Sequence, residues 1–207
     1  MTRGKFITFE GCEGCGKSTQ LRLLSEYLDK KGIDYILTRE PGGSEIAEQI
    51  RRIILDGKNA DMSDECEALL YAAAREQHLK DRVIPALNSG ELVICDRYVD
   101  SSLAYQGTAR GLGEKFIEMI NYHAIHDYSP DLTVFLNLPP DKAFSRKHGA
   151  DENDRMEQQG LDFHMKVYKG YLALAEKYPR ISPVDCSGTK TETNAKIIAL
   201  LESKGII

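Results

Sequence analysis

Residues 9–20, FEGCEGCGKSTQ, decide the fold of this 207-residue chain. Within this stretch, Gly11 to Ser18 match the pattern G-x-x-x-x-G-K-[ST] at every position. The preceding residues, Lys5 to Glu10, are largely aromatic and β-branched and predict a strand, whereas residues 18–32 carry leucines on one helical face and end in a glycine. A glycine-rich turn between a strand and a helix is the context in which this pattern binds phosphate.

The groups in this turn are suited to binding the phosphates of a nucleoside triphosphate. Glycines let the backbone curl so that successive N–H groups point at phosphate oxygens, and the start of the helix adds its positive dipole end. Lys17 can reach the β- and γ-phosphates, and the Ser18 hydroxyl can bind Mg²⁺. We therefore expect ATP to contact Gly11, Cys12, Glu13, Gly14, Cys15, Gly16, Lys17, Ser18 and Thr19.

The same stretch contains a C-x-x-C pair, Cys12 and Cys15, which is also found in zinc sites and redox proteins. A structural zinc ion needs four ligands, and the chain has no second such pair. We favour the interpretation that two variable positions of the phosphate loop hold small side chains, with a redox or zinc protein as the alternative. Cys15 precedes a helix N-terminus and Lys17, surroundings that lower a thiol pKa, so we expect it to react with alkylating agents.

Composition places the chain among ordinary globular proteins, with 42% hydrophobic and 29% charged residues. The net charge of −5 argues against a general nucleic-acid-binding surface. No apolar run approaches the roughly 20 residues that cross a bilayer, and the N-terminus does not resemble a secretory signal. We expect a cytoplasmic protein with no nucleic-acid or membrane partner.

Further strands are predicted in IDYILTR (33–39), ELVICD (91–96), LTVFLNL (132–138) and ISPVD (181–185), with helical patterns between them. This alternation predicts an α/β domain, residues 1–207, with a parallel sheet covered by helices on both faces. Ligands of such sheets bind beyond the carboxyl ends of the strands. Gly11, Arg39-Glu40 and Asp96-Arg97 all follow strands, so we expect them to share one cleft.

Two further segments suit phosphoryl transfer. Asp96 ends a buried strand, where an acid can hold Mg²⁺ or its water shell, and Arg97 offers a planar fork for a phosphate. Residues 145–160 are highly charged and contain Arg146, Lys147 and Arg155, which predicts a mobile lid that brings cations to the transferring group.

Five stretches together resemble the thymidylate kinase (dTMP kinase) family over essentially the whole chain. They are FEGCEGCGKSTQ, TREPGG, YAAAREQH, DRYVDSSLAYQG and DRMEQQGLDFHMKVYKGYLALA, in that order. The resemblance implies a P-loop NTPase fold, three-layer α/β/α with a five-stranded parallel sheet, and a homodimer. It also implies Mg²⁺-dependent transfer of the ATP γ-phosphoryl group to dTMP, giving dTDP and ADP for dTTP synthesis.

Matching motifs carry the family's residue roles onto this chain. Lys17 binds the ATP phosphates, Glu13 lies near the sugar of the monophosphate, and Arg39 and Arg97 grip the dTMP phosphate. Glu40 belongs to the same substrate-binding set, and Asp96 joins Ser18 at the metal. The resemblance assigns the base and sugar to Tyr71, Arg75, Ser102, Tyr105 and Gln106.

Some family members carry a catalytic cation in the phosphate loop, and others carry arginines in the lid. The variable positions of this loop hold no extra cation before Lys17, so the chain resembles the lid-arginine type, with Arg146 and Arg155 as catalytic candidates. The expected consequence is that Arg155→Ala lowers kcat far more than it raises the KM for dTMP.

Two other functional classes stay open on the residues alone. A kinase of a deoxynucleoside or of another monophosphate would use Glu13 or Glu40 to activate a hydroxyl. A nucleotide-gated switch would bind and slowly hydrolyse its nucleotide without an acceptor.

Overall fold

A computed structural model describes residues 3–144, 154–156 and 158–207. Its centre is a sheet of five parallel strands in the order β2-β3-β1-β4-β5, which confirms the expected fold class. Each predicted strand is present within about two residues of its expected bounds. The strands are β1 (Phe6–Glu10), β2 (Tyr35–Arg39), β3 (Leu92–Asp96), β4 (Leu132–Asn137) and β5 (Ile181–Asp185).

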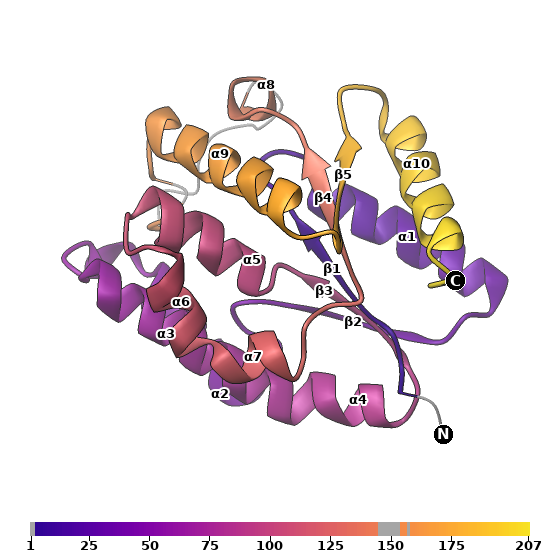
Figure 1. Cartoon of the computed structure of the whole chain (residues 1–207), viewed down its shortest axis with the longest axis horizontal. Coiled ribbons are helices and arrows are strands. Elements are labelled where there is room, and N and C mark those ends of the chain that lie inside the picture. The colour runs from indigo at the N-terminus through magenta and orange to yellow at the C-terminus, as the bar shows by residue number, and fades with distance from the viewer. Residues whose placement is uncertain (1–2, 145–153, 157) are drawn as a thin grey trace.

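Helices cover both faces of the sheet and make three layers (Figure 1). On one face lie α1 (Lys17–Lys31) and α10 (Lys190–Ser203), which bury Leu24 and Ile197 against Ile7 and Phe9 of β1. The opposite face is covered by the remaining longer helices, which pack on side chains such as Phe6 and Phe135. Successive side chains of β1 thus enter different layers of the core, as a strand period of two requires.

The second helical layer is built from several segments of different length. They are α2 (Glu45–Leu55), a 3₁₀ turn (Gly57–Asn59), α3 (Asp64–His78), α4 (Ile84–Asn88), α5 (Val99–Ser102), α6 (Glu114–Ile120), α7 (Tyr122–His126) and α9 (Leu161–Lys177). A short helix that we did not expect, α8 (Pro140–Phe144), follows β4.

Two π-helical turns interrupt this layer. The first, Leu79–Val83, lies just before Pro85, which disturbs regular helix because proline has no N–H and its ring crowds the preceding turn. The second, Leu103–Ala109, continues α5 and carries Tyr105 and Gln106. Turns of this kind occur often at functional sites because they re-aim side chains out of the regular helical spacing.

The loops after β1, β2 and β3 meet at one edge of the sheet. Glu40 N–H donates to the carbonyl of Asp96 over 2.9 Å, and Arg97 N–H donates to the carbonyl of Phe9 over 2.9 Å. The phosphate loop therefore lies beside the polar residues that follow the other two strands. Most of the expected lid, including Arg146 and Lys147, falls outside the described residues.

Candidate active site

The phosphate-loop pattern has the expected surroundings, since it runs from the end of β1 into α1. Gly14 has a φ of 74°, and a Cβ built there would lie 2.6 Å from the carbonyl oxygen of Ala143, so only glycine fits. Lys17 is buried and its Nζ donates to the carbonyl of Gly11 over 3.4 Å. The loop thus forms a compact cradle with a lysine folded across it, which fits a bound triphosphate.

Both loop cysteines are buried, and this overturns the expectation of a reactive Cys15. Cys12 is 0% exposed and Cys15 is 3% exposed, and they belong to two different clusters of the core. Burial raises the pKa of Cys12 to about 12 and also raises the pKa of Cys15. Lys17 does lower the pKa of Cys15, but the cost of burying a thiolate is larger. The two thiols are packing groups of the loop.

A cavity opens beside the phosphate loop, at the carboxyl ends of β1, β2 and β3. It brings together seven residues expected at the substrate site: Glu13, Glu40, Tyr71, Arg75, Arg97, Tyr105 and Gln106. Seven further residues complete its lining: Pro41, Arg51, Leu55, Tyr98, Ser101, Asp154 and Met156. Aromatic rings, cations and amides converging on one cleft are suited to a planar, phosphorylated molecule.

Arg97 lies where the cavity meets the phosphate loop. Its φ of 67° is unusual for a residue other than glycine and turns the chain sharply after β3. The guanidinium donates to Glu13 Oε1 over 2.7 Å and to the carbonyl of Gly11 over 3.1 Å, and it lies 5.2 Å from the ring centre of Tyr105. Arg97 is thereby held against the loop that would carry the ATP phosphates.

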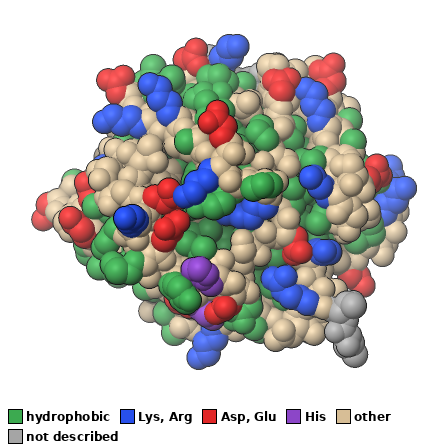
Figure 2. All heavy atoms as spheres, viewed as in Figure 1, with side chains coloured by type: hydrophobic (Ala, Val, Ile, Leu, Met, Phe, Trp, Pro, Cys, Tyr) green, Lys and Arg blue, Asp and Glu red, His purple; other side chains and the backbone are tan. Residues whose placement is uncertain are grey.

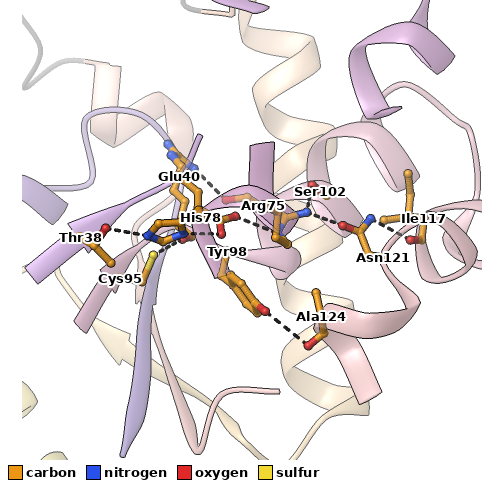
Figure 3. A network of polar contacts seen from close by, with 12 residues as sticks. Thr38, Glu40, Arg75, His78, Cys95, Tyr98, Ser102, Ile117, Asn121 and Ala124 are labelled. Atoms are coloured by element: carbon orange, nitrogen blue, oxygen red, sulfur yellow. Dashed lines mark hydrogen bonds and ion pairs between the residues drawn. The ribbon is translucent and has the colours of Figure 1, made fainter. Parts of the chain in front are cut away.

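Arg75 is the centre of a buried polar network behind the cavity (Figure 3). Its Nε donates to Glu40 Oε2 over 2.7 Å, and its Nη1 donates to Asn121 Oδ1 over 2.6 Å and to Ser102 Oγ over 3.1 Å. Ser102, expected to contact the base, does not line the cavity but supports Arg75 from behind. Glu40 likewise neutralises Arg75, which is 1% exposed.

The network extends from Glu40 into the core. His78 Nδ1 lies 3.0 Å from Glu40 Oε1, and His78 Nε2 lies 2.7 Å from Thr38 Oγ1. Glu40, His78 and Cys95 are the one group of three potential metal ligands that cluster within the described part of the chain. Because the guanidinium of Arg75 already occupies the place of a cation beside Glu40, we interpret the group as a support for Arg75 and not as a metal centre.

Gln106 is oriented by a buried acid, Glu67. Its Nε2 donates to Glu67 Oε1 over 2.8 Å, and Glu67 is 0% exposed. A carboxylate only accepts hydrogen bonds, so the Gln106 amide must turn its nitrogen to Glu67. Its carbonyl oxygen is not used by Glu67, and Gln106 lines the cavity. Tyr71, one turn of α3 beyond Glu67, lines the same cavity, and burial raises the pKa of its hydroxyl.

Arg39 does not share this cavity with Arg97, contrary to our expectation. It forms an ion pair with Glu48 over 2.9 Å and lines a second cavity together with Ser18 and Asp96. Asp96 Oδ1 is buried there without a hydrogen-bond partner. An unpartnered carboxylate oxygen in a cavity that Ser18 also lines fits Mg²⁺ or one of its waters, which is the role expected of Ser18 and Asp96.

Arg51 is a cavity residue that the sequence interpretation missed. It lines the first cavity and donates through Nη1 to the carbonyl of Pro41 over 2.8 Å. A signal was present in the sequence, because Ala47, Arg51 and Ile54 follow the i, i+4, i+7 spacing of one helical face. Ala47 and Ile54 are both buried, so this face of α2 points inward and carries a cation.

Arg155 occupies a different place from the one expected of a lid cation. It is 5% exposed, pairs with Glu67, and donates through Nε to the carbonyl of Ile54 over 3.1 Å. Its guanidinium is therefore held inside the protein by α2 and α3. Its neighbours Asp154 and Met156 line the first cavity.

The face shown in Figure 2 carries interspersed acidic and basic side chains, without a broad basic patch. Among the helices of the described residues, none has the length and apolar character needed to span a bilayer.

A parallel P-loop sheet with a polar and aromatic cleft beside the phosphate cradle fits a nucleoside monophosphate kinase, the class to which the matching family belongs. The family model described as Thymidylate kinase matches residues 9–197. The chain belongs to the thymidylate kinase family, the phosphotransferases that phosphorylate dTMP with ATP as the phosphate donor.

Similar proteins cover nearly the whole chain. A thymidylate kinase of Clostridium novyi (strain NT) is 50% identical over 190 residues, which is 90% of this chain and 93% of that protein. One of Anoxybacillus flavithermus (strain DSM 21510 / WK1) is 48% identical over 200 residues, 95% of this chain and 96% of that protein. One of Halalkalibacterium halodurans is 46% identical over 207 residues, 99% of each.

Proposed function

We propose that the first cavity is the dTMP site and that the phosphate loop beside it holds ATP with Mg²⁺. The observation that carries this proposal is the convergence of Arg97, Arg51, Tyr71, Arg75 and Gln106 on one cleft adjoining the loop. Two cations in the lining of the cleft suit a phosphate, and a ring with polar partners suits a base. A single domain, residues 1–207, carries both sites.

Phosphoryl transfer in this arrangement depends on position and charge. Lys17 and the loop amides hold the β- and γ-phosphates, while Arg97, paired with Glu13, presents the acceptor phosphate to the loop. A phosphate oxygen of dTMP attacks the γ-phosphorus and the bond to ADP breaks, so no covalent enzyme intermediate is required. The acceptor is already ionised near neutral pH (second pKa about 6), so no general base is required either. Ser18 and Asp96 would hold Mg²⁺, which neutralises phosphate charge.

Three side chains would recognise the base, and buried acids orient two of them. Tyr71 offers its ring for stacking, Arg75 offers donors, and Gln106 offers the carbonyl oxygen that Glu67 leaves free. A carbonyl acceptor favours a base with an N–H at that edge, such as thymine or uracil, over cytosine. Tyr105 lies beside Arg97 and would crowd a ribose 2′-hydroxyl.

Assembly and location complete the proposal. We expect a cytoplasmic homodimer, and the apolar side chains Ile46, Ile53 and Leu69, which are 49%, 48% and 51% exposed, offer a surface for the second copy. These residues lie on α2 and α3, which pack against each other.

One assay tests the proposed function. ADP release is measured with ATP and Mg²⁺ against dTMP, dUMP, dCMP, dAMP, dGMP and thymidine. We expect activity with dTMP, weaker activity with dUMP and none with thymidine. Equal rates with every acceptor, or ADP release that needs no acceptor, would contradict the proposal and favour a broad kinase or a nucleotide-gated switch.

A further inference from the structure

Glu10 is a fully buried acid directly beneath the active site. It is the last residue of β1, immediately before the phosphate loop. Its Oε1 accepts from the backbone N–H of Tyr98 over 2.8 Å and of Ser101 over 3.3 Å. Its Oε2 accepts from the Ser101 hydroxyl over 2.6 Å and from the Tyr171 hydroxyl over 2.7 Å. A carboxylate placed here holds the start of α5 and the middle of α9 together.

The two hydroxyls bonded to Glu10 also contact Arg97. Arg97 Nη1 lies 3.3 Å from Ser101 Oγ and 3.4 Å from Tyr171 Oη. Each hydroxyl has a single proton. The two hydroxyl oxygens also lie 2.9 Å from each other, but the carboxylate is nearer to both and is the stronger acceptor, so both protons point to Glu10. The oxygen lone pairs are then free to accept from Arg97. An ionised Glu10 thus makes both hydroxyls hydrogen-bond acceptors for Arg97.

Protonation of Glu10 would reverse part of this arrangement. A neutral carboxyl donates one hydrogen bond, so one of the two hydroxyls would have to accept it, and the proton of that hydroxyl would turn toward the Arg97 cation. Burial, followed by the charge of Asp100, raises the pKa of Glu10 to about 7, while Arg97 opposes the rise. Tyr171, Cys95 and Arg180 are the other titratable or charged groups near it.

We propose that Glu10, acting through Ser101 and Tyr171, is a positioning residue that orients Arg97 toward the phosphate of the acceptor nucleotide. This inference rests on the proposed function, because it assumes that Arg97 binds that phosphate. Glu10 would thus contribute to substrate binding, although it takes no part in the phosphoryl transfer itself. It also predicts that the effect of Glu10 is confined to ligands that carry a phosphate.

The test is calorimetric binding of dTMP and of thymidine, which differ by the phosphate, to the full chain and to Glu10→Gln. In Glu10→Gln we expect dTMP affinity to fall about tenfold, as for the loss of a hydrogen bond to a charged group, and thymidine affinity to stay within about twofold. Equal losses for both ligands, or no loss for dTMP, would overturn the inference. A wild-type protein that binds both ligands equally would instead contradict the assignment of Arg97 and the proposed function.

Two further measurements separate positioning from general damage. Tyr171→Phe removes one of the two hydroxyls without touching a charge and should weaken dTMP binding alone, about threefold to tenfold. Adding Glu10→Gln to an Arg97→Lys variant should cost little more than Arg97→Lys itself, since Glu10 acts through the guanidinium. Additive losses in this double variant would refute the proposed route.

The pH dependence gives a readout that a structural role would not produce. Between pH 6 and pH 8 the ratio of dTMP to thymidine affinity should rise more steeply in the wild type than in Glu10→Gln. The variant corrects for the ionisation of the dTMP phosphate itself, which occurs in both proteins. Parallel curves would contradict the inference.

Discussion

Arg155 and Glu67 form an ion pair inside the protein, 88 residues apart in sequence. The Glu67 side chain is 0% exposed and the Arg155 side chain is 6% exposed. The backbone N–H of Arg155 also donates to the carbonyl of Leu55 over 3.0 Å. Arg155 therefore anchors residues 154–156 to α2 and α3, and this anchoring brings Asp154 and Met156 to the wall of the first cavity.

Arg155→Ala should act on stability and on dTMP binding more than on the chemical step. Without Arg155, Glu67 keeps its ion pair with Arg110 over 3.0 Å, so the free energy of unfolding should fall by about 1–3 kcal/mol, less than for a buried charge left without a partner. The KM for dTMP should rise about tenfold or more because the cavity wall loosens, while kcat changes by less than about tenfold. Urea unfolding and steady-state kinetics measure the two effects.

The exposed Arg22, which pairs with Glu26 on the surface of α1, provides the control. Arg22→Ala should leave both measurements unchanged, since such pairs contribute about 0–1 kcal/mol. A large drop in kcat for Arg155→Ala at unchanged KM would restore the original expectation that Arg155 is a catalytic lid cation.

Arg51 and Arg39 form a matched pair for testing which cation binds the dTMP phosphate. Arg51 lines the cavity with Arg97, whereas Arg39 is paired with Glu48 outside it. Arg51→Ala should raise the KM for dTMP about tenfold to a hundredfold, as for loss of a charge-assisted hydrogen bond of about 1.5–3 kcal/mol. Arg39→Ala should change it by less than about threefold.

The test is which of the two substitutions raises the KM for dTMP more. A larger increase in KM for Arg39→Ala would mean that Arg39 leaves Glu48 and turns to the substrate when dTMP binds. Circular dichroism of both variants checks that neither substitution disturbs the fold.

The sequence sufficed for the sheet and for the location of the site, because both follow from regular patterns. The strand-helix alternation predicts parallel strands, and parallel strands place their following loops at one edge. It did not suffice for the direction of a side chain at a strand end. Arg39 and Glu40 are adjacent, yet Glu40 enters the cavity while Arg39 faces the second one. Arg97 reaches the cavity through a positive φ that the sequence does not reveal.

The supporting acids were missed for a related reason. Glu10 ends an apolar strand and Glu67 lies among other acids in the first turn of α3, and acids in either place are usually exposed. Their burial is explained by partners from distant segments, Tyr171 for Glu10 and Arg155 for Glu67. Sequence spacing does not predict such pairings, so a contact across the fold was needed to identify both acids.

Thiol labelling of the native protein should modify Cys66 and spare the phosphate loop. Cys66 is exposed, whereas Cys12 and Cys15 are buried with raised pKa values. Because the thiolate is the reactive form, an aromatic disulfide reagent should detect one fast thiol, which disappears in Cys66→Ser. Mass spectrometry identifies the site. Fast modification of Cys15 that ATP prevents would show that the loop opens in solution.

The proposed dimer predicts a response to charge on α2. Ile53→Asp places a carboxylate on an apolar surface that is 48% exposed in the single chain, so it should disturb the interface without disturbing the core. Sedimentation velocity should show a dimer for the wild type and a monomer for the variant. Leu161→Asp is the control, because Leu161 is also exposed (44%) but lies on α9, which packs chiefly on residues 103–109, α8 and β5. A wild-type monomer would contradict the proposed assembly.

Glu10 should make the protein less stable as pH rises from about 4.5 to about 7. Its pKa is about 7 in the folded protein against 4.5 for the ordinary group, so the native state binds more protons than the unfolded state in this window. Because the native state binds more protons, the free energy of unfolding falls as the pH rises through this window. It levels off above the folded pKa. The loss of stability over this window is on the order of a few kcal/mol, since a tenfold change in proton affinity is worth about 1.4 kcal/mol.

Urea unfolding of the wild type and Glu10→Gln at several pH values between 5 and 8 measures this effect. The amide does not titrate, so the free energy of unfolding of Glu10→Gln relative to wild type should increase steadily up to about pH 7. Other titrating groups occur in both proteins and cancel in the difference. A difference that does not vary with pH would mean that Glu10 is ionised throughout. Suppose that the free energy of unfolding of Glu10→Gln relative to wild type rises with pH, and that Glu10→Gln binds dTMP more weakly than wild type. The ionised carboxylate is then retained because it orients Arg97, at a cost in stability near neutral pH.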